Sequence, residues 1–448
     1  MSEAETFLAA HPEVEAIDIL LHDANGVGRG KIIRRHELAG LYEQGRHLPV
    51  SILGLDICGE DVHETGLIWD KGDGDQRAWP IPGTLVPLHG TNRAEVLMSV
   101  HELDGTPAGS DPRHALQRQV DAFAADGLRP AGAFELEFFL LANDRDAHGR
   151  IQPARDVLDG RATTRTEVYS VDHLHGMLPL FDDIYAGAAK AGIRAETMIS
   201  EFAPGQYELT LHYRTDVMQA ADDLVRLKRI VRAQARAHGV TACFMPKPFE
   251  QFAGSGMHFH VSLQGDGGNV FSETGEGWSD TILHAIGGLR QTMAESMLVF
   301  APHANSWRRF ASQSYAPVSP TWGVNNRSVA LRIPAGDLRA RRIEHRPAGV
   351  DANPYLVAAT VLAGIRHGMK NRTDPGAETV GNGYDAAPDP TMPTDWREAI
   401  RAAQGSAFLR DALGEDLHRT FTAIKAAELA RVSRTITELD FDLYLHTV

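Results

Sequence analysis

The chain has few cysteines and no long apolar segment. Cys58 and Cys243 are its only two cysteines among 448 residues, and they are far apart, which excludes a disulfide scaffold and a paired-cysteine zinc site. No run approaches 18 apolar residues, and the N-terminus is acidic instead of basic and then apolar. We therefore expect no transmembrane helix, no signal peptide and no membrane partner, and predict a cytoplasmic protein.

Positive charge is also scarce. The 44 Lys and Arg residues oppose 59 Asp and Glu residues, which gives a formal net charge of −15. This balance argues against nonspecific binding to nucleic acid, so we expect no nucleic-acid partner. Apolar residues make up 43% of the chain, enough to bury a large core, and this excludes general disorder.

The pattern of apolar and turn residues predicts a small β-rich unit followed by a larger mixed one, an α+β fold. Residues 15–22 predict a strand, and Asn25-Gly26 after it is typical of a hairpin. Residues 105–112 are rich in Gly, Pro, Ser and Asp, and Asp111-Pro112 predicts the start of a helix that runs to about residue 126. Further strands are expected at 133–141, 196–202, 206–212 and 257–263, and helices at 173–191, 215–238, 279–300, 352–371 and within 393–435.

Residues 134–141 form an apolar segment that Glu135 and Glu137 interrupt. Side chains alternate between the faces of a strand, so both glutamates face the same side. Two carboxylates about 7 Å apart repel each other unless cations lie between them. The spacing therefore favours a site for Mg²⁺ or Mn²⁺, with a solvated strand face as the alternative.

Two more groups of side chains suit the same chemistry. Glu201 and Glu208 flank a Pro-Gly turn, so they can face one site from adjacent strands, although surface positions explain them equally well. His258, His260 and Ser262 follow a glycine-rich turn and share one face of an expected strand. Alternating histidines are typical of a metal or phosphate site, and structural histidines are the alternative.

Residues 308–346 are rich in arginine and contain no lysine. The eight arginines are Arg308, Arg309, Arg327, Arg332, Arg339, Arg341, Arg342 and Arg346. Arginine without lysine favours bidentate recognition of phosphate or carboxylate over a solvated basic face. Glu344 lies within this run and is a further candidate ligand. Carboxylates for cations together with arginines for phosphates predict a phosphoryl-transfer site, although the chain has no Walker loop.

Over nearly its whole length the sequence resembles the glutamine synthetase superfamily. The motifs that carry the resemblance are Glu135-x-Glu137, Met245-Pro246-Lys247-Pro248, Gly254-Ser255-Gly256-Met257-His258-x-His260, Asn325-Asn326-Arg327-Ser328, Arg332-Ile333-Pro334, Arg342-Ile343-Glu344-x-Arg346 and Asn353-Pro354-Tyr355. The resemblance implies an N-terminal β-grasp domain, residues 1–108, and a catalytic domain, residues 109–448. In the catalytic domain an antiparallel sheet surrounded by helices forms an active-site barrel. The resemblance also implies a homododecamer of two hexameric rings with active sites between neighbouring subunits.

The resemblance also assigns roles to individual residues. The implied ligands of one metal ion are Glu137, Glu201 and Glu208, and those of a second ion are Glu135, His258 and Glu344, with two to three Mg²⁺ or Mn²⁺ ions per site. The residues implied to bind glutamate and the transferred phosphoryl group are Gly254, Arg309, Arg327 and Arg346. Those implied to bind ATP are Glu196, Tyr213, His260, Ser262, Arg332, Arg339 and Arg342. The implied reaction phosphorylates the γ-carboxylate of glutamate, and an amine then attacks the acyl phosphate.

The sequence departs from glutamine synthetase where ammonium would bind. Tyr315 replaces the flap glutamate that precedes the Ala-Pro pair, and Ala253 replaces an asparagine. Asp56 keeps at best the acid of the ammonium-binding region. Because an amine of pKa near 10 is only about 0.1% neutral at pH 7, a penalty of roughly 4 kcal/mol, losing a carboxylate harms ammonium use most. The loss also makes room for an organic amine.

These features resemble the γ-glutamyl-amine ligases, which use putrescine, other polyamines, ethanolamine or monoamines. We therefore expect an ATP-dependent glutamate–amine ligase in amine or polyamine catabolism, with Asp56, Arg327 and Tyr315 in its catalytic site. One alternative is a glutamine synthetase, which Tyr315 and Ala253 disfavour. Another is an inert scaffold, which the six retained metal ligands disfavour, and a third is a ligase for a different acceptor acid.

Overall fold

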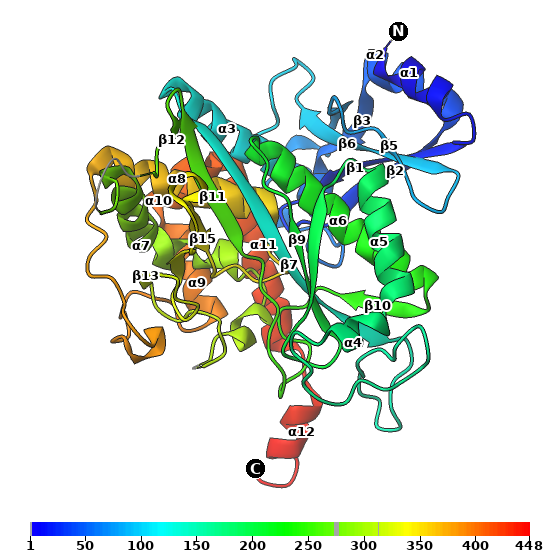
Figure 1. The fold of residues 1–448 in the computed structure, drawn as a ribbon. Coiled ribbons are helices and arrows are strands. Elements are labelled where there is room, and N and C mark those ends of the chain that lie inside the picture. Colours follow the sequence, from blue (N-terminus) through cyan, green and yellow to red (C-terminus); the bar gives the residue numbers. More distant parts are fainter. Residues whose placement is uncertain (1, 273–276, 312) are drawn as a thin grey trace.

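The computed structural model describes residues 2–272, 277–311 and 313–448, and its strands form two sheets with helices around them (Figure 1). The N-terminal sheet has the order β2-β1-β6-β4-β3, with β5 also paired to β6. Its strands are β1 (Ala16–His22), β2 (Gly28–Arg34), β3 (Arg46–Pro49), β4 (Asp75–Pro80), β5 (Val86–Pro87) and β6 (Arg93–His101). Helices α1 (Glu3–Ala10) and α2 (Leu38–Gln44) share its apolar core. This strand content is consistent with the expected β-grasp domain, and its boundary at residue 108 stays a prediction.

The second sheet has the order β13-β14-β15-β11-β7-β9-β8, with β10 paired to β7 and β12 to β11. Its strands are β7 (Arg129–Ala142), β8 (Ala195–Ser200), β9 (Gln206–Leu211), β10 (Val240–Cys243), β11 (Phe259–Gly265), β12 (Gly268–Asn269), β13 (Trp322–Val324), β14 (Leu331–Ile333) and β15 (Ile343–His345). Every neighbouring pair is antiparallel except β13 and β14, which run parallel. The curled sheet and the surrounding helices confirm the expected α+β class.

Helices cover the second sheet and extend away from it (Figure 1). They are α3 (Pro112–Ala125), α4 (Val171–His175), α5 (Leu178–Lys190), α6 (Val217–Ala237), α7 (Asp280–Phe300), α8 (Pro354–Asn371), α9 (Trp396–Gly405), α10 (Ala407–Leu413), α11 (Glu415–Arg434) and α12 (Glu438–Tyr444). Short 3₁₀ turns lie at Arg35–Glu37, Val50–Leu53, His63–Thr65, Trp69–Lys71, Ser306–Arg309, Leu338–Ala340 and Gly383–Asp385. No helix in the described ranges is both long enough and apolar enough to cross a membrane.

The central strand β7 separates the core from the site. Its even-numbered residues from Phe134 to Leu140 are fully buried in the main core, and α3 and α6 pack against this strand. Glu135 and Glu137 therefore lie on the opposite face, as the alternation of side chains predicts.

The helix expected over residues 173–191 is divided in two. Helix α4 ends at His175, and α5 begins at Leu178 with Pro179 in its first turn. At the break, a Cβ on Gly176 would lie 2.3 Å from Cγ of Asp156. Pro179 is a local signal for this break, because proline suits the first turn of a helix and not its interior. The packing of Asp156 against Gly176 is visible only in the folded chain.

Candidate active site

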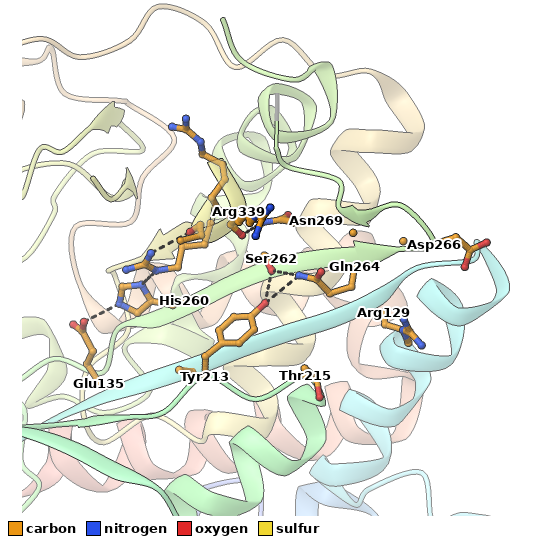
Figure 2. Close-up of a pocket in the computed structure, with 16 residues that line it drawn as sticks. Arg129, Glu135, Tyr213, Thr215, His260, Ser262, Gln264, Asp266, Asn269 and Arg339 are labelled. Atoms are coloured by element: carbon orange, nitrogen blue, oxygen red, sulfur yellow. Dashed lines mark hydrogen bonds and ion pairs between the residues drawn. The ribbon is translucent and has the colours of Figure 1, made fainter. Parts of the chain in front are cut away.

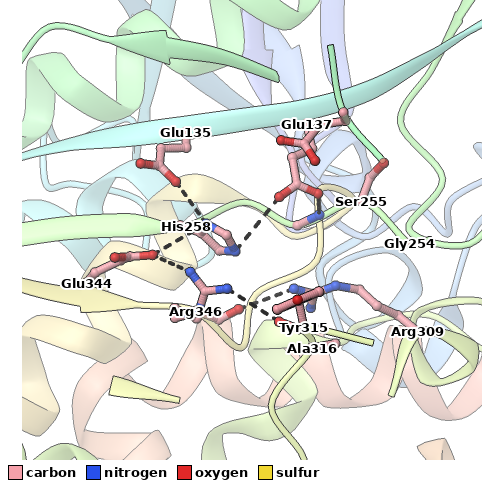
Figure 3. Close-up of polar contacts among 12 residues, drawn as sticks. Glu135, Glu137, Gly254, Ser255, His258, Arg309, Tyr315, Ala316, Glu344 and Arg346 are labelled. Carbon is pink, nitrogen blue, oxygen red and sulfur yellow. Dashed lines mark hydrogen bonds and ion pairs between the residues drawn. The ribbon is translucent and has the colours of Figure 1, made fainter. Parts of the chain in front are cut away.

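Glu135 and Glu137 contact the histidine-bearing strand beside them (Figure 3). The carboxylate oxygens of Glu135 lie 2.8 Å from Nδ1 of His258 and 2.8 Å from Nε2 of His260. Glu137 accepts a hydrogen bond of 2.7 Å from the backbone N–H of Gly256 and lies 3.9 Å from Nε2 of His258. Both glutamates thus surround His258, which is buried.

Glu201 and Glu208 add two acids to this cluster from the neighbouring hairpin. Glu208 on β9 is the Cα partner of Glu137, and Glu201 directly follows β8. Burial, followed by the charges of Glu135 and Glu137, raises the pKa of Glu208 to about 10. Burial and the charge of Glu137 raise the pKa of Glu201 to about 7. On this side of the cluster, burial and like charges outweigh the charge of Arg327, which acts on Glu201 in the opposite direction.

Glu344 is compensated differently. This buried residue on β15 accepts hydrogen bonds from Arg332 at 2.7 Å and from Arg346, and it lies 3.7 Å from Nδ1 of His258. Burial by itself would raise the pKa of Glu344. The charges of His260 and Arg346 outweigh burial, so the pKa of Glu344 is lowered. Glu135 behaves in the same way: burial would raise its pKa, but the charge of His260 lowers it, and the pKa of Glu135 is lowered overall. Arginine side chains thus bind the cluster directly at Glu344.

The donor atoms of the cluster fit divalent cations. Two groups have ligand atoms within 4.8 Å of one another: Glu135, Glu208 and His258, and Glu135, His260 and Glu344. Carboxylate oxygens with one imidazole nitrogen suit Mg²⁺ or Mn²⁺. Four of the six predicted metal ligands, Glu135, Glu208, His258 and Glu344, belong to these groups, and Glu135 belongs to both. Glu137 and Glu201 are in neither group, and their role as ligands stays a prediction. One of the groups also includes His260, which the resemblance assigned to ATP binding.

A cavity of about 950 Å³ adjoins the acid cluster (Figure 2). Its polar lining includes Arg129, Glu135, Tyr213, Thr215, His260, Ser262, Gln264, Asp266, Asn269, Arg339, Arg341 and Arg342. His260 connects the two regions, because its Nε2 contacts Glu135 and its Nδ1 lies 3.1 Å from Nε of Arg342. The cavity is large enough for a nucleotide.

Five of the seven residues assigned to ATP line this cavity, namely Tyr213, His260, Ser262, Arg339 and Arg342. Arg332 instead binds Glu344, and Glu196 contacts His212. Sequence reasoning missed Gln264, which donates a 3.0 Å hydrogen bond to Oγ of Ser262. The signal was available, because Gln264 continues the alternation that placed His258, His260 and Ser262 on one face.

The residues assigned to glutamate lie on the other side of the cluster (Figure 3). Arg309 is buried and donates to the carbonyl oxygens of Pro347 at 2.8 Å and of Arg346 at 3.3 Å. A Cβ on Gly254 would lie 2.8 Å from Cγ of Arg309, so this glycine allows the arginine to approach closely. Tyr315 contacts Arg346 through its carbonyl oxygen at 3.4 Å, and its side chain is 62% exposed.

Asp56 and Arg327 are placed differently. Asp56 accepts hydrogen bonds from the backbone N–H groups of Cys58 and Glu60, and its other oxygen lies 3.3 Å from Arg431 on α11. Within one chain, these contacts tie Asp56 to its own loop and to α11 instead of to the acid cluster. Arg327 is exposed, and its charge opposes the rise in the pKa of Glu201.

Comparison with known proteins bears on the family and the fold of the whole chain. A family model described as the glutamine synthetase catalytic domain matches residues 109–444. The γ-glutamylputrescine synthetase of Escherichia coli strain K12 is 38% identical over 446 residues, which cover 99% of this chain and 94% of that protein. The glutamine synthetase of Pyrococcus abyssi is 28% identical, with 99% of each chain covered. The solved structure of a GmaS–ADP complex superposes with a TM-score of 0.85 at 28% identity, covering 99% of this chain and 100% of that one.

Proposed function

The chain belongs to the glutamine synthetase family and is a carbon–nitrogen ligase, and from this premise we propose that it joins the γ-carboxylate of glutamate to an organic amine. ATP would first phosphorylate that carboxylate to γ-glutamyl phosphate, and the amine would then displace the phosphate. The observation that carries the proposal is the contact between the acid cluster and the nucleotide-sized cavity through His260.

The residues around this contact divide the work between them. The six acidic and histidine ligands would hold two to three Mg²⁺ or Mn²⁺ ions, which neutralise phosphate charge when bound. Arg339 and Arg342 line the cavity on the ATP side, where guanidinium groups orient phosphates. Arg309 and Arg346 would hold glutamate, and the exposed Arg327 would meet the transferred phosphoryl group.

Two observations, one on a residue and one on sequence identity, favour an organic amine over ammonium as the substrate. Tyr315 occupies the flap position of an acid that would bind and deprotonate ammonium, and its exposed ring leaves that position uncharged. In addition, identity to the amine ligase of E. coli is 38%, against 28% and 32% to the glutamine synthetases of P. abyssi and Methanosarcina mazei. We place the reaction in amine or polyamine catabolism.

We further propose a homododecamer in which neighbouring subunits complete each active site. The placement of Asp56 supports this arrangement, because its contacts within one chain lead to α11 and not to the acids. A neighbouring chain would bring its Asp56 to the amine. Light scattering and negative-stain microscopy of the purified protein test the assembly.

The function is tested by measuring phosphate release from ATP and glutamate with ammonium, methylamine, ethanolamine, putrescine, spermidine and an aromatic amine. We expect turnover with one organic amine and little with ammonium, and Glu137→Ala serves as the inactive control. A preference for ammonium would establish a divergent glutamine synthetase instead. Turnover only when another acid replaces glutamate would refute the assignment of the acceptor.

A further inference from the structure

Resting on the proposed function, we propose that His173 is a positioning residue that holds the two acids of the β8–β9 hairpin in register for metal binding. His173 lies on α4 and is 2% exposed. Its Nδ1 is 2.8 Å from Oγ of Ser200, and its Nε2 is 3.3 Å from Oη of Tyr207. One imidazole therefore spans both strands of the hairpin.

The two residues that His173 contacts are next to the two acids. Ser200 and Tyr207 are Cα partners across β8 and β9, and each directly precedes a glutamate, Glu201 and Glu208 respectively. Because side chains alternate along a strand, Glu208 lies on the face opposite to Tyr207. His173 thus holds the hairpin from behind while its acids face the site.

The hydrogen-bond pattern determines how the imidazole is protonated. The Ser200 hydroxyl donates its one proton to the carbonyl oxygen of Glu167 at 3.0 Å, so Nδ1 of His173 must donate to Oγ of Ser200. Burial lowers the pKa of His173, which keeps the ring neutral. Nε2 is then the acceptor, and the hydroxyls of Tyr207 at 3.3 Å and of Thr163 at 3.4 Å are both within reach to donate to it. The direction of the bond between His173 and Ser200 is therefore defined, and Nε2 faces Tyr207 as an acceptor.

The segment that carries His173 is itself fastened to the hairpin. The N–H of Tyr169, a residue with a φ of +59°, donates to the carbonyl oxygen of Ser200 at 2.9 Å. Behind α4, the buried Asp156 binds Arg161 at 3.1 Å and fills the space that a side chain at Gly176 would need. The position of His173 is therefore built by several contacts and does not depend on α4 alone.

A mechanical reason for such a bridge lies on the other face. Glu208 lies opposite Glu137 across β7 and β9, and Glu201 lies at the end of the adjoining strand β8. When they are charged, acids placed in this way destabilise paired strands, so a bridge from behind favours the closed hairpin. Residues that orient metal ligands from outside the coordination sphere typically change metal affinity 10- to 100-fold when they are replaced.

The test is Mn²⁺ binding to the full-length protein, measured by electron paramagnetic resonance and calorimetry without substrates. We expect His173→Ala and Tyr207→Phe to weaken Mn²⁺ binding about 10-fold or more. His173→Asn keeps a donor near the position of Nδ1, so it should recover part of the lost affinity. Tyr207→Phe removes only one hydroxyl group, so it still tests the proposal if His173→Ala does not fold. His418→Ala is the matched control, because His418 is also buried but binds the carbonyl oxygen of Ala403 in the C-terminal helices.

Equal Mn²⁺ affinity in wild type, His173→Ala and Tyr207→Phe would overturn the proposal. An equal loss of Mn²⁺ affinity in His418→Ala would also overturn it, because the loss would then reflect general destabilisation of the protein. If the wild type binds no Mn²⁺ at the cluster, the positioning role is refuted. If it binds Mn²⁺ normally but ligates no amine, only the proposed function is refuted.

Discussion

Glu137 and Glu208 lie directly opposite one another as Cα partners on the antiparallel strands β7 and β9. Like charges in this relationship destabilise a sheet. The protein provides His258 at 3.9 Å from Glu137 but no comparable cation for Glu208 among the hydrogen bonds and ion pairs of the described residues. The pair therefore explains why this face of the sheet suits bound cations, and it leads to the first prediction.

Glu208→Gln should stabilise the metal-free protein. The pKa of Glu208 is raised to about 10, so at pH 7 folding forces this buried carboxyl to take up a proton that the unfolded chain has lost. Glutamine removes this penalty, and we expect a gain of about 1–2 kcal/mol, of the size typical for single substitutions. Thermal unfolding in EDTA measures the gain, and it should disappear or reverse when Mn²⁺ is added. A loss of stability in EDTA would contradict the electrostatic argument.

Metal affinity should increase with pH between 6 and 8. The pKa values of Glu201 and Glu208 are raised to about 7 and about 10, so protons compete with the metal across this range. For the same reason the metal-free protein should lose stability as pH rises from the ordinary glutamate pKa through 7 towards 10. Calorimetric Mn²⁺ titrations at pH 6, 7 and 8 in two buffers should show tighter binding and proton release. Affinity that does not depend on pH would mean that these acids do not bind the metal.

Arg327→Ala should lower kcat by at least about 10²-fold and leave the assembly unchanged, because a side chain that stabilises a transferred phosphoryl group acts mainly in the transition state. Arg327 is exposed, so its removal leaves no buried cavity. Steady-state kinetics and size-exclusion chromatography measure the two effects. Arg308→Ala, in the same arginine-rich segment, is the control and should keep most of the activity. Retained turnover in Arg327→Ala would show that its assignment is wrong.

Tyr315→Glu should increase the use of ammonium relative to organic amines. The new carboxylate would bind and deprotonate ammonium where the exposed tyrosine ring offers no charge. The ratio of kcat/KM for ammonium and for the preferred amine measures the change, and we expect it to rise about 10-fold or more. Tyr315→Phe controls for loss of the hydroxyl alone. If the ratio is the same in all three proteins, Tyr315 has no part in amine selection.

Gln264→Ala should raise KM for ATP several-fold with little change in kcat. Gln264 lines the cavity and donates to Oγ of Ser262, which also contacts the Tyr213 hydroxyl. These groups lie away from the acid cluster, so they affect nucleotide binding more than the chemical step. Kinetics at varied ATP concentration separate the two parameters. A large fall in kcat without a change in KM would place Gln264 in the reaction instead.

Local sequence was enough to predict the elements and side chains whose positions depend on near neighbours. Alternation along one strand placed Glu135 and Glu137 on one face, and Asp111 with Pro112 marked the start of α3. The glycine turn before β11 and the alternation of His258 and His260 likewise predicted that both histidines would meet one site. These features follow from backbone geometry over a few residues, so a single sequence contains them.

Only the tertiary structure decided how distant side chains share their contacts. Glu344 pairs with Arg332 and Arg346, while His260 serves both Glu135 and Arg342. Asp56 lies beside Arg431, 375 residues later in the chain, and Asp156 packs against Gly176 at the break between α4 and α5. These outcomes depend on strand register and on packing between elements that are far apart in sequence. Local periodicity identifies which residues are charged and which face they occupy, but the folded chain determines which opposite charge each one reaches.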